Sequence, residues 1–204
     1  MKKTLLSLAL AGALLLTAFG GATLAWFTDT TEVKENIFTV GNVDITLTEP
    51  NWDELGSEDA PEVYPGEALA KDPTVENTGL NPCFVRLQVT GLDVLGDAGN
   101  ITYRTDYVNE KLGDGWVLHT DGYFYYEAPL AAAGSEEDGL VSKTDALFDQ
   151  IVIPTGLTNG DGQTEFSVDV VAQAVQAQGA KASWSQVKAM TVPEIAQWFA
   201  TCGL

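Results

Sequence analysis

Few residues of this sequence are of the types that do chemistry. The chain of 204 residues has one histidine, His119, and two cysteines, Cys83 and Cys202. A single imidazole excludes the HExxH zinc helix and any metal site built from several histidines. A Cys83–His119 nucleophile pair has no local motif to support it, and a buried structural cysteine is the more usual case. The sequence therefore predicts no catalytic and no cofactor-binding residue, and it leaves the metal ligands unknown.

Carboxylates gather in two segments, residues 51–62 and 131–138. Calcium prefers oxygen ligands, but neither segment has the complete spacing of a calcium loop, so we favour solvated loops. The Asn-Gly-Asp-Gly run at 159–162 is more typical of a hairpin turn. Calcium or zinc binding is therefore possible, but no motif in the sequence supports it.

Cys83 and Cys202 have two alternative interpretations. In an exported chain they can form a disulfide that ties the C-terminal tail to the rest of the fold. Two free thiols are the other alternative, and the sequence does not decide between them because it gives no distance.

The N-terminus is typical of a secretory signal peptide over residues 1–25. Lys2 and Lys3 precede an apolar stretch that ends in small residues, and the expected cleavage lies between Ala25 and Trp26. The alternative is a retained membrane anchor, because a span of this length can cross a bilayer. We therefore expect contact with the membrane only through the uncleaved signal segment.

The charge of the chain restricts its partners. The formal net charge is −19, and cleavage removes two lysines and no acidic residue, which leaves −21. Binding to nucleic acid needs clustered Lys and Arg, so a nucleic-acid partner is excluded. The expected product is an acidic, exported domain.

Short runs with period-2 alternation, separated by turn residues, predict a mainly β fold: an antiparallel, jelly-roll-like β-sandwich over residues 26–182. The expected strands lie at 42–48, 85–90, 101–107, 116–120, 123–127, 148–153 and 166–176. Residues 183–204 form a helical tail, in which the apolar spacing predicts two short helices broken at Pro193. No βαβ rhythm is present, which disfavours a dinucleotide-binding fold.

Arg86 and the aromatic run at 123–126 are candidate binding residues with simpler explanations. Arg86 lies on the polar face of its strand, where a surface or cross-strand role is more usual than a substrate clamp. The aromatic run suggests a sugar-stacking platform, but alternation sends half of its rings to the core. Both features therefore favour structural roles.

Several motifs carry a resemblance to a known family. The run Gly21-Ala-Thr-Leu-Ala-Trp-Phe-Thr-Asp-Thr30, followed by Phe38-Thr-Val-Gly-Asn-Val43, resembles the start of the TasA/camelysin family. Later blocks, in the same order as in the family, are Tyr64-Pro-Gly-Glu67, Lys71-Asp-Pro-Thr-Val-Glu-Asn-Thr-Gly79, Phe84-Val-Arg-Leu87, Tyr125-Tyr126, Leu147-Phe148 and Ala172-Gln-Ala-Val-Gln176.

The resemblance implies a secreted protein of the matrix or cell surface of a Gram-positive bacterium, processed by a SipW-type signal peptidase. For the TasA branch it implies a biofilm matrix fibre subunit that self-assembles, or joins other surface proteins, by adding its N-terminal segment as a donor strand to the next copy. The donor residues would be Trp26, Phe27, Thr28, Asp29, Thr30 and Thr31. The alternative is that this segment folds back as the first strand of its own sheet.

The camelysin branch implies instead a cell-surface metalloendopeptidase. With one histidine and no HExxH, no catalytic position of that branch can be transferred to this chain, so enzyme activity is uncertain. A surface adhesin that binds sugar or protein is the third hypothesis.

Overall fold

The computed structural model describes residues 42–57, 63–95, 101–103, 111–135, 139–156 and 167–204. By its internal contacts the chain divides into Met1–Val33 and Lys34–Leu204, and every described residue lies in the second unit. In the part that the structure describes, the helices are too short or too polar to span a bilayer.

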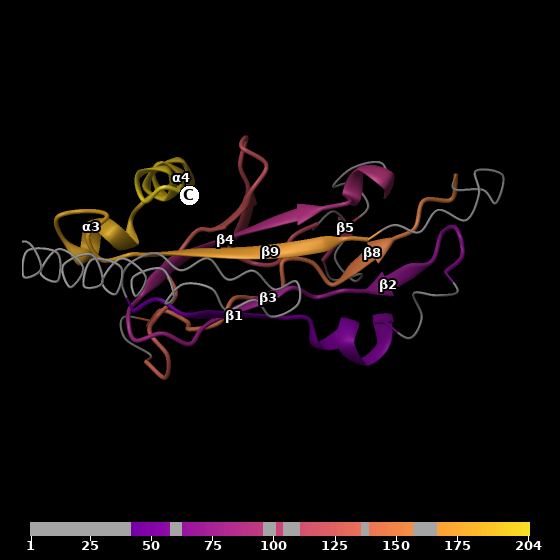
Figure 1. Ribbon diagram of the computed structural model, residues 1–204, viewed down its shortest axis with the longest axis horizontal. Helices are drawn as coiled ribbons and strands as arrows, with labels where there is room; N and C mark the ends of the chain where they lie inside the picture. Colours follow the sequence, from indigo (N-terminus) through magenta and orange to yellow (C-terminus); the bar gives the residue numbers. More distant parts are fainter. Residues whose placement is uncertain (1–41, 58–62, 96–100, 104–110, 136–138, 157–166) are drawn as a thin grey trace, which may run out of the picture. The chain divides into compact units, whose positions relative to one another are not determined.

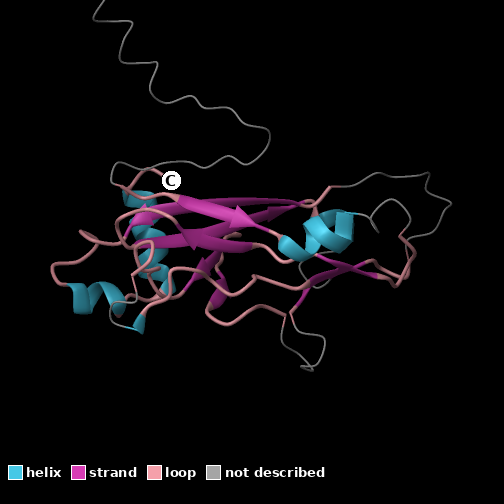
Figure 2. Ribbon diagram, turned by 90° about the horizontal axis from the view of Figure 1, so that it is seen from below, coloured by secondary structure: helices cyan, strands magenta, loops and turns pink. Residues whose placement is uncertain are grey.

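Three antiparallel sheets make up the described part of the second unit (Figures 1 and 2). The largest has the order β6-β7-β4-β9, the second β2-β8-β5, and the smallest pairs β1 with β3. Their bounds are β1 Ile45–Thr48, β2 Ala68–Ala70, β3 Thr74–Asn77, β4 Cys83–Thr90, β5 Ile101–Thr102, β6 Trp116–Leu118, β7 Phe124–Tyr126, β8 Gln150–Val152 and β9 Asp169–Gln176. The helical turns and helices are η1 Trp52–Gly56, η3 Leu92–Leu95, α3 Trp184–Lys188 and α4 Val192–Thr201.

The predicted mainly β fold with antiparallel sheets and short C-terminal helices is confirmed, whereas the jelly-roll topology stays a prediction. Two strands were missed: β2 contains two alanines in three residues, and β3 has one apolar side chain in four. Neither shows the alternation of bulky apolar residues on which strand prediction depends. They are held by tertiary pairing, β2 with β8 and β3 with β1.

The first hydrophobic core lies on one face of the four-stranded sheet. β4 contributes Cys83, Val85 and Leu87 to it, and other sheets add side chains such as Ile45, Val75 and Ile151. Because Cys83 is fully buried among these apolar groups, burial raises the pKa of its thiol to about 12. This side of β4 follows the predicted alternation.

The second core lies on the opposite face of the same sheet, where α3 and α4 cover it. Phe84, Tyr125 and Val175 of the sheet pack with Ile195 and Phe199 of α4. The four-stranded sheet is therefore buried on both faces. The C-terminal helices close the second of them, at the end of the sheet where Figure 1 shows α3 and α4.

The break between the two helices was placed wrongly at Pro193. The structure ends α3 at Lys188 and begins α4 at Val192, so Pro193 lies in the first turn of α4. A proline is tolerated there because its missing N–H belongs to a group without a helical partner. The apolar spacing correctly predicted two helices but not the residues at which the first ends and the second begins.

We expect the start of α4 to lose stability in acid through Glu194. Its carboxylate accepts hydrogen bonds from Lys181 Nζ at 2.8 Å and from the backbone N–H of Thr191 at 2.9 Å. These contacts, Lys181 first, lower the pKa of Glu194 from 4.5 to about 2. The stabilisation is thus fully present above pH 4.5 and is lost as the pH falls toward 2.

Urea midpoints measured across this pH range test the expectation. Glu194→Gln should flatten the acid dependence, and Lys181→Met should reduce it through loss of the principal partner. An unchanged acid dependence in Glu194→Gln would assign it to other carboxylates.

Candidate functional site

The outer edge of β9 is the longest strand edge that the structure describes. Cys83 exchanges both backbone hydrogen bonds with Leu130, at 3.1 and 2.7 Å, so its polar groups point away from β9. The antiparallel register pairs Cys83 with Gln176 and continues for eight residues. Along an antiparallel ladder, the backbone groups of successive residues point alternately toward and away from the paired strand. Because Cys83 and its partner Gln176 do not bond each other, the backbone groups of Val170, Ala172, Ala174 and Gln176 point away from β4.

One end of this edge is already occupied. The indole Nε1 of Trp198 in α4 donates a hydrogen bond of 2.9 Å to the carbonyl oxygen of Gln176. Among the described residues, the outward groups of Val170, Ala172 and Ala174 have no such partner. Ala172 and Ala174 are each only 2% exposed, so this part of the edge is buried in the structure. We call these three positions the β9 edge.

A shallow groove of about 380 Å³ lies where β9 ends and β4 begins. The backbone N–H of Ala177 donates to the carbonyl oxygen of Pro82 at 2.9 Å, which joins the two strand ends at the groove. Leu80 stands at its rim with 72% of its surface exposed. We call this depression the Leu80 groove; its apolar lining is Leu80, Pro82, Ala131, Ala132, Leu140 and Trp184.

The first described residues of the chain lie beside the same groove. The backbone N–H groups of Thr78 and Gly79 both donate to the carbonyl oxygen of Asp44, at 2.9 and 3.1 Å. A Cβ on Gly79 would come within 2.7 Å of the carbonyl oxygen of Asn42, so only glycine permits this approach. Asn42, the first described residue, therefore lies close to the residue that precedes Leu80.

Arg86 is the most strongly polar group inside the second core. Its side chain is 5% exposed, and its Nε donates to Gln173 Oε1 at 2.7 Å while Nη1 donates to the Tyr125 hydroxyl at 2.9 Å. Its Cζ lies 3.8 Å from the ring centre of Tyr123 and 4.5 Å from that of Phe199. The expected cross-strand role is confirmed by Gln173 and Tyr125, whereas the expected surface position is wrong because α4 covers this face.

The polar contacts of Arg86 continue toward the surface. The Tyr125 hydroxyl donates to Asp121 Oδ2 at 2.8 Å, and His119 Nδ1 lies 3.1 Å from Asp121 Oδ1. Burial raises the pKa of Tyr125 to about 12. Burial also raises that of Asp121, but hydrogen bonds from the Tyr123 backbone, Tyr125 and His119 outweigh it and leave the pKa lowered. The arrangement fixes the β6–β7 turn, and none of its side chains lines the Leu80 groove.

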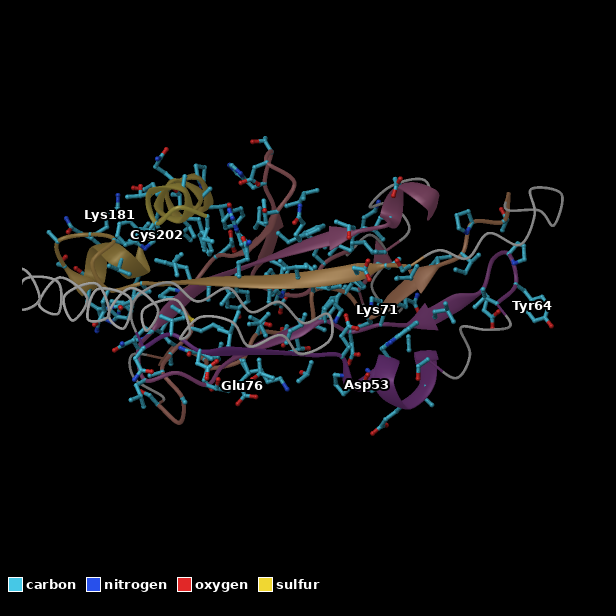
Figure 3. The ribbon with its side chains drawn as sticks, in the orientation of Figure 1. Asp53, Tyr64, Lys71, Glu76, Lys181 and Cys202 are labelled. Carbon is cyan, nitrogen blue, oxygen red and sulfur yellow. The ribbon has the colours of Figure 1, made fainter. Side chains whose placement is uncertain are left out.

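A second buried cation, Lys71, follows β2 (Figure 3). Its Nζ lies 2.8 Å from Glu49 Oε2 and 4.7 Å from the ring centre of Trp52. The neighbouring Asp72 accepts hydrogen bonds from the backbone N–H groups of Asn51 and Trp52. Burial raises the pKa of Asp72 despite these bonds. The cluster fastens η1 to β2.

The structure accounts for several residues singled out from the sequence. Cys83 and Cys202 are free thiols in this structure and lie in the first and second cores, on opposite faces of the sheet. Phe124 and Tyr125 are buried and Tyr123 and Tyr126 half-buried, so the run makes no flat sugar platform. Asp53 and Glu54 are exposed on η1.

Ala25, Trp26 and the other donor-strand residues lie outside the described residues, as do 136–138 and 159–162. Sequence reasoning missed the β9 edge and the Leu80 groove. The run 166–176 signalled a strand, but nothing in it tells an edge strand from a central one. The groove is formed by the loops that follow β3, β7 and β9, together with Trp184 at the start of α3.

One comparison with known proteins gives a match. Residues 1–93 match the family model described as camelysin metallo-endopeptidase. This confirms the resemblance read from the motifs over that part of the sequence. No match was found among curated proteins or among solved structures.

The described residues do not fit the metal centre that this description implies. A catalytic zinc site takes three protein ligands and keeps one open position. His119 and Asp121 are neighbours, but among the described residues no group of three His, Cys, Asp or Glu side chains is placed to hold a metal.

Proposed function

We propose, from the match of residues 1–93 to the camelysin family, that this chain is an exported structural subunit of a cell-surface or matrix fibre. In this proposal signal cleavage after Ala25 frees the segment 26–33, and this segment of one copy adds as a strand to the β9 edge of the next. The resemblance to the TasA branch suggested this mode of assembly. Camelysin-family membership supports an extracellular or cell-surface location.

The β9 edge is the observation that carries the proposal. The backbone groups of Val170, Ala172 and Ala174 point away from β4 in a sheet whose two faces are covered, and Ala172 and Ala174 are each 2% exposed. A segment of another copy would have to displace what buries this edge, and main-chain hydrogen bonds to β9 would then provide the affinity. The other edge of this sheet, β6, is three residues long.

The segment 26–33 is suited to this edge. It has eight residues, as β9 has, and its threonines and Val33 favour an extended conformation. The edge and the segment are different surfaces of the molecule, so the contact is head-to-tail and generates an open filament.

The charge of the mature chain opposes assembly. Subunits of net charge −21 repel one another unless salt, protons or divalent cations reduce the repulsion. Fibres should therefore form more readily at mildly acidic pH or with added calcium than at high pH and low salt.

The alternative, a metallo-endopeptidase, rests on the family description. Among the described residues it has no metal centre to support it. The fibre proposal is supported by the position of β9 at the margin of the four-stranded sheet that the structure describes.

Electron microscopy and sedimentation of the mature chain, begun at Trp26, test the proposal at neutral and mildly acidic pH. We expect fibres from this chain and none after deletion of residues 26–31. A synthetic peptide of residues 26–33 should block elongation, while a peptide of the same composition in scrambled order should not. Fibres that form equally well without the segment would overturn the proposal.

A further inference from the structure

The β9 edge is buried along only part of its length. Asp169 at the start of β9 is exposed and Val170 is half-buried, whereas Ala172 and Ala174 are each 2% exposed. An exposure this low includes the main chain, so the outward backbone groups of both alanines are also shielded from solvent. The covered part of the edge is therefore the half that leads to Gln176.

The buried backbone groups of this half need hydrogen-bond partners. Roughly nine in ten or more of the buried N–H and C=O groups in native proteins are paired, because an unpaired group loses its bonds to water without replacement. Among the described residues, the outward groups of Ala172 and Ala174 have no partner. We therefore expect their partner in a part of the chain outside the described residues.

The chain enters the described fold close to the covered end of β9. The loop between β3 and β4 links the two places: its Gly79 lies against Asn42, and its Pro82 accepts a hydrogen bond from Ala177, the residue after β9. β1, which follows Asn42, contacts β9 as well. The backbone bends at Asn42, directly after Gly41, so the preceding residues can turn toward the β9 edge.

We infer that residues 37–40 of the same copy form a strand on the β9 edge, beside Ala172 and Ala174, and keep this edge closed in the monomer. The run is Ile37-Phe38-Thr39-Val40, and all four residue types favour strands. The cover itself does not depend on the proposed strand addition, whereas its effect on assembly rests on it.

The length of the chain fits this cover. Residues 37–41 reach about 17 Å from Asn42 when extended, and the stretch of β9 from Gln176 back to Ala172 spans about 13 Å. Residues 157–166 also lie outside the described residues, but they lead into the Asp169 end of β9, where the edge is exposed. The segment before Asn42 is therefore the better placed of the two.

The cover would control the proposed assembly. Residues 26–33 of a second copy reach β9 only when residues 37–40 of the first leave it. Once displaced, residues 37–40 can extend from their own copy toward the next one. The residues that close the edge in the monomer would thus become part of the link between subunits in a fibre.

Hydrogen exchange of single backbone amides tests the cover in the mature chain at neutral pH and low salt. The outward amides, Ala172 and Ala174, point to the proposed cover, and the inward amides, Val171 and Gln173, point to β4 and are internal controls. We expect all four to be protected and nuclear Overhauser contacts to join residues 37–40 to the outward amides. Rapid exchange of both outward amides, or contacts from them to other segments and none to residues 37–40, would overturn the inference.

A pair of prolines removes the cover. Proline has no N–H and disrupts strand pairing, and two adjacent prolines affect both alternating positions of the strand. Phe38→Pro with Thr39→Pro should speed exchange of the outward amides by at least about tenfold, while protected inward amides show that the variant is folded. Lys34→Pro with Glu35→Pro is the matched control and should leave all four amides protected. Outward amides that stay protected in the first variant would assign the cover to another segment.

Fibre formation separates the cover from its effect on assembly. Phe38→Pro with Thr39→Pro should form fibres at a concentration at least about tenfold below that of the parent, because no cover has to be displaced. Fibres from both chains at the same concentration would overturn the effect on assembly. Absence of fibres from every chain would overturn the proposed function and this effect with it, while exchange of the outward amides still decides the cover.

Discussion

Replacing Arg86 by alanine is expected to lower the free energy of unfolding by about 3 kcal/mol, the usual range for truncating a large side chain that is buried and hydrogen-bonded. The guanidinium lies against the rings of Tyr123 and Phe199 and bonds Gln173 and Tyr125. Its removal leaves a cavity between the sheet and α4. It also leaves the Gln173 amide oxygen without its donor.

Arg86→Met separates packing from polar contacts. The methionine keeps an unbranched apolar stem between the two rings but loses both hydrogen bonds, so we expect a smaller destabilisation than for alanine. Urea unfolding of the parent, Arg86→Ala and Arg86→Met measures the order of their free energies of unfolding. An alanine variant as stable as the parent would show that Arg86 adds nothing to the docking of α4.

Arg86 also shows what the pattern of a single strand can predict. The alternation of β4 correctly assigned Val85, Leu87 and Val89 to the first core and Arg86 to the other face. It could not show that α4, more than 100 residues later, covers that other face. A polar residue is typical of a solvent-exposed face, but here it is satisfied by Gln173 and Tyr125 from the neighbouring strands. The burial of Arg86 is a tertiary property.

The sequence predicted the chemical character of the segment proposed to assemble, but not the place in the fold that would receive it. The sequence predicted a β-compatible segment with apolar residues at its tip, and those residues lie outside the described part of the chain. Its proposed receptor depends on the position of β9 at the margin of the described four-stranded sheet. Strand order and loop packing arise from contacts between distant residues, which local periodicity does not encode.

Lys71→Ala is expected to lower the free energy of unfolding by about 3–5 kcal/mol, because it leaves the Glu49 carboxylate largely buried without its counter-charge. The side chains of Lys71 and Glu49 are 6% and 17% exposed. Glu49 Oε1 is already buried without a hydrogen-bond partner, so Oε2 depends on Lys71 at 2.8 Å. The contact of Lys71 with the Trp52 ring is lost in the same variant.

The double variant Lys71→Met with Glu49→Met distinguishes pairing from packing. It removes both charges and keeps side chains of similar size, and such replacements of buried ion pairs are often neutral or stabilising. We therefore expect its urea midpoint to lie close to that of the parent and well above that of Lys71→Ala. If the double variant is instead as unstable as Lys71→Ala, the ion pair itself, rather than the uncompensated charge, holds η1 against β2.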